Sequence, residues 1–359
     1  MIDDHKLLYH PGVVARWLEA GDDWERLKKV YPVYVEISPF GACNFRCSFC
    51  AMDFLGYEKN RLDLNILHAR LATMARKGVK SVVFAGEGEP LLHTELDAAF
   101  ARCREVGLDP ALVTNASVPN RRALKSAVQH CRWIKASVNA GTASTHAKIH
   151  RTTDQTFERI WDNLAYCADQ RRSLNSTCTL GAQAVLIEDN WDEMVTLAKL
   201  CRNAGLDYLA IKPYSQHPGS ITHQHEGTDY RNAPELASLL AAEETEGFKV
   251  HFRSSAFAQA QSSKKSYHQC YSTPYFWAFI RANGEVFGCL DFLQDPRFRY
   301  GNLYESDFDE IWEGEARKAA SQYMQSSHDL SQCRVNCRMN KVNEYLDQLK
   351  SPSAHANFI

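Results

Sequence analysis

The chain has 359 residues, of which 45% are hydrophobic and 23% charged, as in a soluble globular protein with room for one large and one smaller domain. A formal net charge of −2 gives no global attraction to nucleic acid, and no apolar run approaches the roughly 18 residues of a membrane span. The first residues include two acids and lack the basic and apolar regions of a secretory signal, so we expect a cytoplasmic protein with no nucleic-acid or membrane partner.

Strands and helices alternate regularly from residue 34, after a helical extension over residues 1–33. Strand-like runs cover residues 34–38, 79–86, 110–115, 133–140, 177–186 and 208–214, and helix-like segments cover residues 62–77, 94–106, 120–131, 156–171 and 190–204. Parallel strands need helix-length returns, so residues 34–214 are predicted to form an α/β core domain. Six units fit a partial barrel or an open sheet, with functional residues at the carboxyl ends of the strands.

The alternation stops after residue 214. Residues 215–248 are predicted to be a linker with one helix at 233–244, and residues 249–359 a small α+β domain. Strand-like runs at 276–281 and 285–289 flank Asn283-Gly284, which is a strong hairpin signal. Helices are expected over residues 309–325 and after residue 340.

Twelve cysteines in a chain without a secretory signal indicate metal binding or catalysis rather than disulfides. Cys43, Cys47 and Cys50 follow the first strand, and three thiolates on one loop can hold three corners of an iron–sulfur cubane while the fourth iron stays open. Zinc would need a fourth ligand nearby, and no further His or Cys occurs before His68. Five others are expected to be buried core residues: Cys103, Cys131, Cys167, Cys178 and Cys201.

The spacing Cys43-x3-Cys47-x2-Cys50, with Phe49 before the last cysteine, resembles the signature of the radical SAM superfamily. The resemblance implies a partial (β/α)6 TIM-like barrel and a [4Fe–4S] cluster whose open iron binds S-adenosylmethionine (SAM). It also implies reductive cleavage of SAM to a 5′-deoxyadenosyl radical. Residues 86–90, Gly-Glu-Gly-Glu-Pro, resemble the family's loop for the SAM ammonium group, with Glu87 in place of a glycine.

The same resemblance implies SAM contacts at these residues: Phe49, Gly88, Glu89, Thr114, Asn115, Ser137 and Asn139. For the polar residues after the third and fourth strands, capping and turn chemistry is the alternative role. His146 and His150 are spaced like a zinc pair on a metalloprotease helix, but Ala147 stands where the glutamate would be, so zinc is not expected there.

A second cysteine set, Cys270, Cys289, Cys333 and Cys337, resembles a shortened SPASM domain of the Twitch kind. The resemblance implies one auxiliary [4Fe–4S] cluster that four thiolates close completely; a four-cysteine zinc site is the alternative. A nearby cluster can accept the second electron when a substrate radical is oxidised, which favours dehydrogenation. Twitch clusters can also bind substrate or only shape the pocket.

Candidate substrate contacts are Lys212, Tyr214, Arg253 and Arg281, because fixed cations suit phosphate or carboxylate groups; surface ion pairing is the alternative. The loop histidines are expected to be exposed to solvent: His217, His223 and His225.

Only 33 residues precede the first strand, fewer than the leader-recognition module of many peptide-modifying relatives. We therefore expect dehydrogenation or epimerisation of a sugar, nucleotide-sugar or aminocyclitol, with an external electron donor such as flavodoxin or ferredoxin. Epimerisation needs a hydrogen donor, which one of the five spare cysteines could supply. The alternatives are modification of a ribosomal peptide, a maturase that acts on a partner enzyme, and a non-catalytic iron–sulfur electron carrier.

Overall fold

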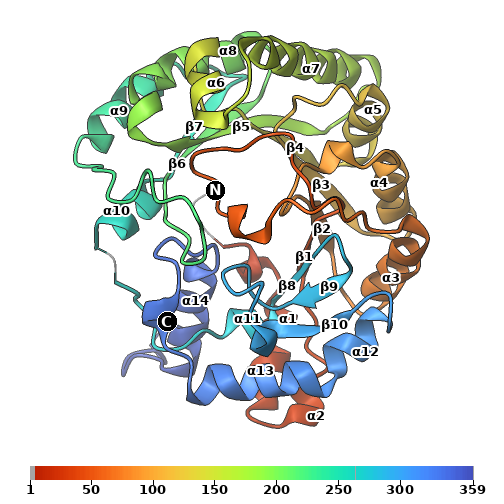
Figure 1. Cartoon of the computed structure of the whole chain (residues 1–359). Helices are drawn as coiled ribbons and strands as arrows, with labels where there is room; N and C mark the ends of the chain where they lie inside the picture. The colour runs from red at the N-terminus through yellow and green to blue at the C-terminus, as the bar shows by residue number, and fades with distance from the viewer. Residues whose placement is uncertain (1–4, 263, 359) are drawn as a thin grey trace.

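The computed structural model describes residues 5–262 and 264–358, and its centre is a curved sheet in which ten strands take the order β10-β9-β8-β1-β2-β3-β4-β5-β6-β7. The six strands expected from the sequence lie in chain order and pair in parallel. They are β1 (Tyr34–Ile37), β2 (Ser81–Phe84), β3 (Asp109–Thr114), β4 (Trp133–Ser137), β5 (Thr179–Leu186) and β6 (Tyr208–Pro213). The predicted α/β class is confirmed, and the curved parallel sheet forms a partial barrel (Figure 1).

Helices follow successive strands and cover the outer face of the sheet (Figure 1). These are α3 (Leu64–Arg76), α4 (Leu96–Glu105), α5 (Arg121–His130), α7 (Asp154–Ser173) and α8 (Met194–Asn203). Two begin at residues that suit a helix start: Asp63 accepts a hydrogen bond from the Asn65 amide, and Asn120 accepts one from the Ala123 amide. The short helix α6 (Ala143–His150), after β4, has no counterpart among the predicted helices.

Alternate residues of each strand face opposite sides of the sheet. In β4, Ile134 and Ala136 are buried in the hydrophobic cluster that includes Leu124 and Val128 of α5, whereas Lys135 between them is only partly buried. Residues of one strand point alternately to its two faces, so Lys135 lies on the inner face of the barrel. All five spare cysteines are buried in the outer cluster or beside it, as expected: Cys103, Cys131, Cys167, Cys178 and Cys201.

The sheet continues beyond residue 214, contrary to the expected end of the alternation. Strand β7 (Lys249–Phe252) pairs in parallel with β6, and β8 (Trp277–Ile280) pairs in parallel with β1. The hairpin predicted at Asn283-Gly284 is present between β8 and β9 (Glu285–Phe287), and β10 (Arg299–Asn302) extends it. The division into domains stays a prediction, but the sheet itself runs across the expected boundary at residue 249.

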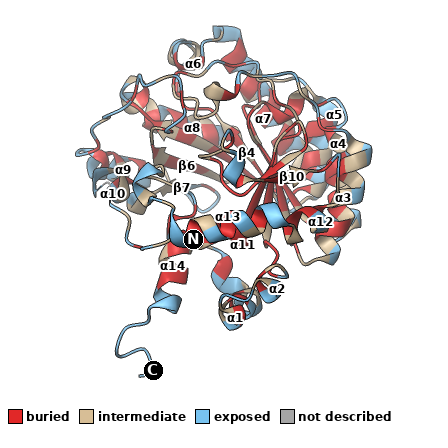
Figure 2. Ribbon diagram, turned by 60° about the horizontal axis from the view of Figure 1, so that its bottom comes forward, coloured by how far each residue is buried: buried red, intermediate tan, exposed pale blue. Residues whose placement is uncertain are grey.

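Helices outside the barrel complete the chain. They are α1 (Pro11–Ala20), α2 (Trp24–Leu27), α9 (Ala233–Ala241), α10 (Ser254–Ser262), α11 (Ser272–Tyr275), α12 (Phe308–Glu313), α13 (Glu315–Ser326) and α14 (Asn340–Lys350). The single helix expected over residues 309–325 is two helices, because Gly314 takes an extended conformation with φ −78° and ψ 167°. Buried residues gather in the strands and on the inward sides of the helices, while residues 351–358 form an exposed tail (Figure 2).

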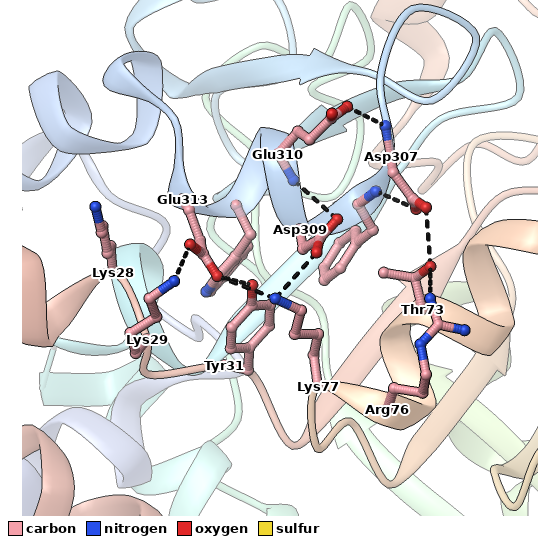
Figure 3. A network of polar contacts seen from close by, with 12 residues as sticks. Lys28, Lys29, Tyr31, Thr73, Arg76, Lys77, Asp307, Asp309, Glu310 and Glu313 are labelled. Carbon is pink, nitrogen blue, oxygen red and sulfur yellow. Dashed lines mark hydrogen bonds and ion pairs between the residues drawn. The ribbon is translucent and has the colours of Figure 1, made fainter.

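A polar network attaches α12 to the core (Figure 3). The carboxylate of Glu313 accepts a hydrogen bond from Tyr31 at 2.5 Å and pairs with Lys77 at 3.3 Å, and Asp307 accepts one from Thr73 at 2.9 Å. These side chains come from the segment before β1, from α3 and its C-terminal end, and from α12 and the residue before it. The C-terminal part of the chain is therefore held on the barrel by specific contacts.

Across residues 5–262 and 264–358, no helix combines the length and the apolar character that crossing a bilayer requires. Residues 1–4 of the expected N-terminal extension lie outside the described residues.

Candidate active site

The first three cysteines lie on the loop after β1, and Figure 1 shows this loop crossing the centre of the ring of strands. All three side chains are partly exposed. Backbone amides point at two of the sulfurs: the Phe45 amide lies 3.4 Å from Cys43 Sγ, and the Met52 amide lies 3.4 Å from Cys50 Sγ. Such donors favour the thiolate form, which is the form that binds metal.

The electrostatics of the three thiols fit a metal cluster. Burial is the main cause that raises the pKa of Cys43 to about 12, and burial also raises the pKa of Cys50 and, most strongly, of Cys47. Cys50 and Cys43 raise the pKa of Cys47 further, so three free thiolates would be unstable together without cations. Iron supplies that charge. Across the part of the chain that the structure describes, no three His, Cys, Asp or Glu side chains converge tightly enough to bind a single metal ion. The ligands of a cubane cluster need not lie so close together, because each thiolate binds a different iron.

The loop at residues 86–90 lies against the cysteine loop. The Glu89 amide donates to the Ala42 carbonyl at 2.9 Å, and a Cβ at Gly88 would overlap the carbonyl oxygens of Phe40 and Ala42. Only glycine allows the two backbones to approach so closely. The two motifs found in the sequence therefore form one surface at the carboxyl ends of β1 and β2.

We expected the carboxylate of Glu89 to face the SAM ammonium group, but most of its hydrogen bonds are made within the protein. It is 2% exposed and accepts hydrogen bonds from the Leu91 amide at 3.0 Å, the Asn115 amide at 2.8 Å and the Thr114 hydroxyl. A carboxylate has about four acceptor positions, so one at most is left for a SAM ammonium group. The main contacts of Glu89 and Thr114 join the carboxyl ends of β2 and β3.

The remaining predicted SAM contacts divide into two groups. The side-chain amide nitrogen of Asn115 donates to Asn44 Oδ1 at 2.9 Å and lies 4.0 Å from Cys43 Sγ, beside the cysteine loop. Ser137 is partly exposed on the inner face of the sheet. Asn139 is 1% exposed, and its Oδ1 accepts from the Val185 amide at 2.7 Å. Asn139 therefore holds β4 against β5. We expected its side chain to contact SAM, but the side chain is buried and not open to a ligand.

Sequence reasoning missed the role of His150, the last residue of α6. Its Nδ1 lies 3.0 Å from Cys47 Sγ, its Nε2 lies 3.0 Å from the Val138 carbonyl, and the side chain is 1% exposed. Phe49 meets the same ring edge-on, with the ring centres 5.3 Å apart. His150 lies in a segment that resembles the family's sequence after the fourth strand, but nothing in the sequence indicated that its side chain reaches Cys47 Sγ.

The second cysteine set also comes together. Each of Cys289, Cys333 and Cys337 has its pKa raised by burial and by the neighbouring thiols, Cys337 to about 12. Donors face these sulfurs as well: Asn343 Nδ2 lies 3.4 Å from Cys270 Sγ, and the Met339 amide lies 3.4 Å from Cys337 Sγ. Cys270 packs in one apolar cluster with Cys289 and Cys337, so three desolvated thiols and a fourth cysteine, with donors at two of the four sulfurs, fit a closed cluster.

A short segment links the two cysteine sets. The one-turn helix η2 (Asp53–Leu55) follows Cys50, and its apolar residues pack in the cluster that contains Cys270 and Cys289. Phe54 stacks on His217 with ring centres 4.9 Å apart, and His217 Nε2 lies 3.3 Å from the Leu290 carbonyl, next to Cys289. The chain therefore connects its two cysteine sets through one packed layer.

Two of the three loop histidines are buried, contrary to expectation. His217 is 1% exposed and His225 is 5% exposed, whereas His223 is exposed as predicted. His225 Nε2 lies 2.8 Å from the Ser48 hydroxyl, so residues 215–228 fold back onto the cysteine loop. The polar composition of this segment concealed its packing, because its contacts are to distant residues: Ser48 lies 177 positions before His225, and Leu290 lies 73 positions after His217.

The four candidate substrate contacts have different surroundings. Lys212 lies at the end of β6 on the inner face, and Tyr214 packs in a small cluster with Phe49. Arg253 follows β7 and is partly exposed. Arg281 instead pairs with Glu87 at 2.8 Å and with Glu285 at 3.1 Å. The guanidinium of Arg281 is paired with two carboxylates, so we no longer expect it to bind substrate.

Comparisons with known proteins agree with this geometry. The sequence model of the Radical SAM superfamily matches residues 37–201, which contain the first cysteine set and the loop at 86–90. The model of an iron–sulfur cluster-binding domain, SPASM, matches residues 270–338, which contain the four cysteines of the second set.

Individual relatives have varied activities. The chain is 31% identical over 192 residues, 51% of its length, to a GTP 3′,8-cyclase of Chlorobaculum tepidum. It is 22% identical over 239 residues, 63% of its length, to a dTDP-4-amino-4,6-dideoxy-D-glucose ammonia-lyase of Streptomyces venezuelae. These matches span 55% and 49% of the two relatives, about half of each.

Solved structures confirm the fold. The structure of Streptococcus suis SuiB bound to the precursor peptide SuiA superimposes with a TM-score of 0.68 at 17% identity, covering 97% of this chain and 78% of that one. Identity this low supports the shared architecture, a barrel with a C-terminal cluster domain, and not a shared substrate.

Proposed function

Because this chain belongs to the radical SAM superfamily and carries a SPASM-type cluster domain, we propose that it oxidises a small sugar-like molecule by removing a hydrogen atom from carbon. The substrate class is a sugar, nucleotide-sugar or aminocyclitol, and the reaction would belong to carbohydrate biosynthesis. The enzyme has a SAM-binding [4Fe–4S] cluster, one auxiliary [4Fe–4S] cluster and SAM as cofactors. When bound, the first cluster supplies the electron that cleaves SAM to a 5′-deoxyadenosyl radical, and the second can accept an electron.

The observation that carries the proposal is the partly exposed inner face of β4, β5 and β6. Ser137, Gln183 and Lys212 line that face with polar groups, and Phe49 and Tyr214 form an apolar patch beside them. Small molecules with hydroxyl groups bind where apolar surface and a few fixed polar groups meet. The ammonia-lyase of S. venezuelae, whose name specifies a nucleotide-sugar, supports this substrate class.

Oxidation is favoured over epimerisation by the position of the spare cysteines. Epimerisation ends with transfer of a hydrogen atom back to carbon, and a thiol is the usual kind of donor. Cys103, Cys131, Cys167, Cys178 and Cys201 lie in the cluster on the helix side of the sheet. In an oxidation the substrate radical instead loses one further electron and one proton, which gives a carbonyl or an imine.

An external reductant, such as a flavodoxin or ferredoxin, would provide the electrons for SAM cleavage. Peptide modification is the competing function, since SuiB was solved with its precursor peptide. The sugar-oxidising and peptide-modifying functions can be distinguished by the substrate from which the enzyme removes a hydrogen atom.

The test uses the reconstituted protein, SAM and a strong reductant without oxygen, with candidate sugars deuterated at each carbon in turn. We expect deuterium in 5′-deoxyadenosine with one labelled position of a sugar-class substrate, and a product two mass units lighter than the unlabelled substrate. With unlabelled substrate, a product that keeps the substrate's mass in ordinary water and becomes one mass unit heavier in deuterated water would contradict oxidation. Transfer of deuterium only from peptides would contradict the sugar class.

A further inference from the structure

The inner face of the barrel has a partly open hollow along β4, β5 and β6, next to an apolar cluster of buried residues that includes Val83 of β2 and Ala111 of β3. Along β4, β5 and β6 the helix-facing residues are nearly fully buried: Ile134, Ala136, Ala182, Ala184 and Ile211 are each 2% exposed or less. Of the inner-facing residues that alternate with them, Gly181 and Ala210 are buried, whereas five keep accessible surface: Lys135, Ser137, Gln183, Val185 and Lys212. Because both sets lie in the middle of the same sheet, the difference shows that solvent-sized space remains on the concave side.

Two lysines that point into this hollow lack the partners that buried cations normally have. Lys135 Nζ lies 5.5 Å from the ring centre of Trp133, and neither Lys135 nor Lys212 makes a hydrogen bond or an ion pair within residues 5–262 and 264–358. Burial is the first cause that lowers the pKa of Lys135 to about 8, and it lowers the pKa of Lys212 as well. Proximity to Lys135 lowers the pKa of Lys212 further, and in the sheet β5 alone separates the strands that carry the two lysines.

One carboxylate, that of Glu36, raises the pKa of Lys135, while Arg253 and Arg338 lower the pKa values of both lysines. Glu36 of β1 is 3% exposed, and its carboxylate is bound by Arg338. Arg334 adds positive charge, with its guanidinium donating to the Ser215 carbonyl at 2.7 Å. A buried cation without a counter-ion destabilises a protein, so a pair of them points to an anion that is bound in the working enzyme.

We propose that Lys135 and Lys212 form a binding site for the phosphate of a phosphorylated small-molecule substrate in this hollow. Two unpaired ammonium groups match the charge of a phosphomonoester, about −2 at neutral pH, whereas a carboxylate would leave one of them unbalanced. Lysine is also a common phosphate-binding residue. The inference rests on the proposed function and adds to it the class of substrate.

The sheet register places the two lysines on either side of one inner-facing layer. Lys135 is opposite Gly181 in the sheet register, and Ser137 and Gln183 form the next pair towards the carboxyl ends of the strands. Lys135 therefore lies one inner-facing layer deeper than Ser137, whereas Lys212, opposite Val185, lies one layer nearer the carboxyl ends than Gln183. A phosphate between the two amines would anchor the substrate at the level of Ser137 and Gln183, while its carbon skeleton extends towards the cysteine loop.

The experiment measures binding of inorganic pyrophosphate to the reconstituted protein by anaerobic calorimetry, with chloride added to keep the ionic strength constant. The variants are Lys135→Met, Lys212→Met and the double variant, and Lys125→Gln on the exposed side of α5 is the matched control. We expect saturable binding by the parent protein and the control, a Kd at least tenfold weaker in each single variant, and no measurable binding in the double variant.

Two further readouts keep the result decisive. Iron content and formation of 5′-deoxyadenosine without substrate should stay unchanged in all variants, because neither lysine touches a cysteine or the SAM loop. Pyrophosphate binding that survives the double substitution, or is absent from the parent protein, would overturn the site. Loss of iron in the lysine variants would overturn it too, since it would make the lysines counter-charges of the auxiliary cluster. Absence of SAM cleavage in the parent protein would instead refute the proposed function.

Discussion

Glu87 is the residue at which the SAM loop departs from its family pattern. Its side chain is 4% exposed and reaches across to the end of β8, where it pairs with Arg281 at 2.8 Å and accepts from the Ala282 amide at 2.8 Å. A glycine at this position could make neither contact. The substitution therefore ties the loop at residues 86–90 to the strand that leads into the cluster domain.

Removing the Arg281–Glu87 ion pair should lower the free energy of unfolding. In Arg281→Met the carboxylate of Glu87 stays buried with one backbone donor left, and loss of one partner of a buried pair costs about 3 kcal/mol. We expect Tm to fall by about 5 °C or more and SAM to bind more weakly.

The matched control is Arg297→Met, which removes a pair with Asp295 whose arginine is 52% exposed. Exposed pairs contribute less than about 1 kcal/mol, so its Tm should hardly change. Equal thermal shifts in the two variants would contradict the role given to the buried pair.

At the scale of elements, the contact between the β1 and β2 loops depends on Gly88. A methyl group there would overlap the carbonyl oxygens of Phe40 and Ala42, and backbone atoms cannot move aside as a flexible side chain can. Gly88→Ala should therefore displace the cysteine loop and reduce 5′-deoxyadenosine formation by at least about 100-fold, as small misplacements of reacting groups do.

Gly12→Ala is the control for this change. Gly12 lies in α1, where only the tip of Arg16 is near, and alanine in a helix stabilises by about 0.5–1 kcal/mol. Its activity should equal that of the parent protein. Full activity in Gly88→Ala would show that the two loops do not need their close approach.

The elements themselves were largely predictable, because hydrophobic alternation and helix periodicity are local properties. The six parallel strands, their intervening helices and the Asn283-Gly284 hairpin were expected and are present. The pairing of β8 with β1 was not, since residues more than 240 positions apart meet through tertiary packing that no local pattern encodes. The break at Gly314 was also missed, because the residues on both sides of it favour helix.

The candidate site was predictable to the extent that motifs define it. The cysteine spacings identified both sets, and the loop at 86–90 was found from its position after the second strand. Three features needed the structure: the burial of His217, the approach of His150 to Cys47, and the inward position of Lys135. Each of them follows from how distant segments pack rather than from the residues beside it.

For the whole molecule, the sheet is the frame that brings the two cysteine sets together. Strand β1 precedes the first set, β8 and β9 carry the chain between Cys270 and Cys289, and β1 and β8 are neighbours. The packing of Phe54 on His217 adds a second connection. We infer that the two clusters form one functional unit, with the barrel interior beside them.

Iron and sulfide counting on the anaerobically reconstituted protein, together with 5′-deoxyadenosine formation, tests the central claim most directly. The parent protein should hold about eight irons, and the variant with Cys43, Cys47 and Cys50 replaced by alanine about four, as two four-iron clusters require. That variant should form no 5′-deoxyadenosine, whereas replacement of the buried core residues Cys103 and Cys201 by alanine should leave both values unchanged. A parent protein that carries zinc at the first loop, or that leaves SAM intact under strong reduction, would contradict the account.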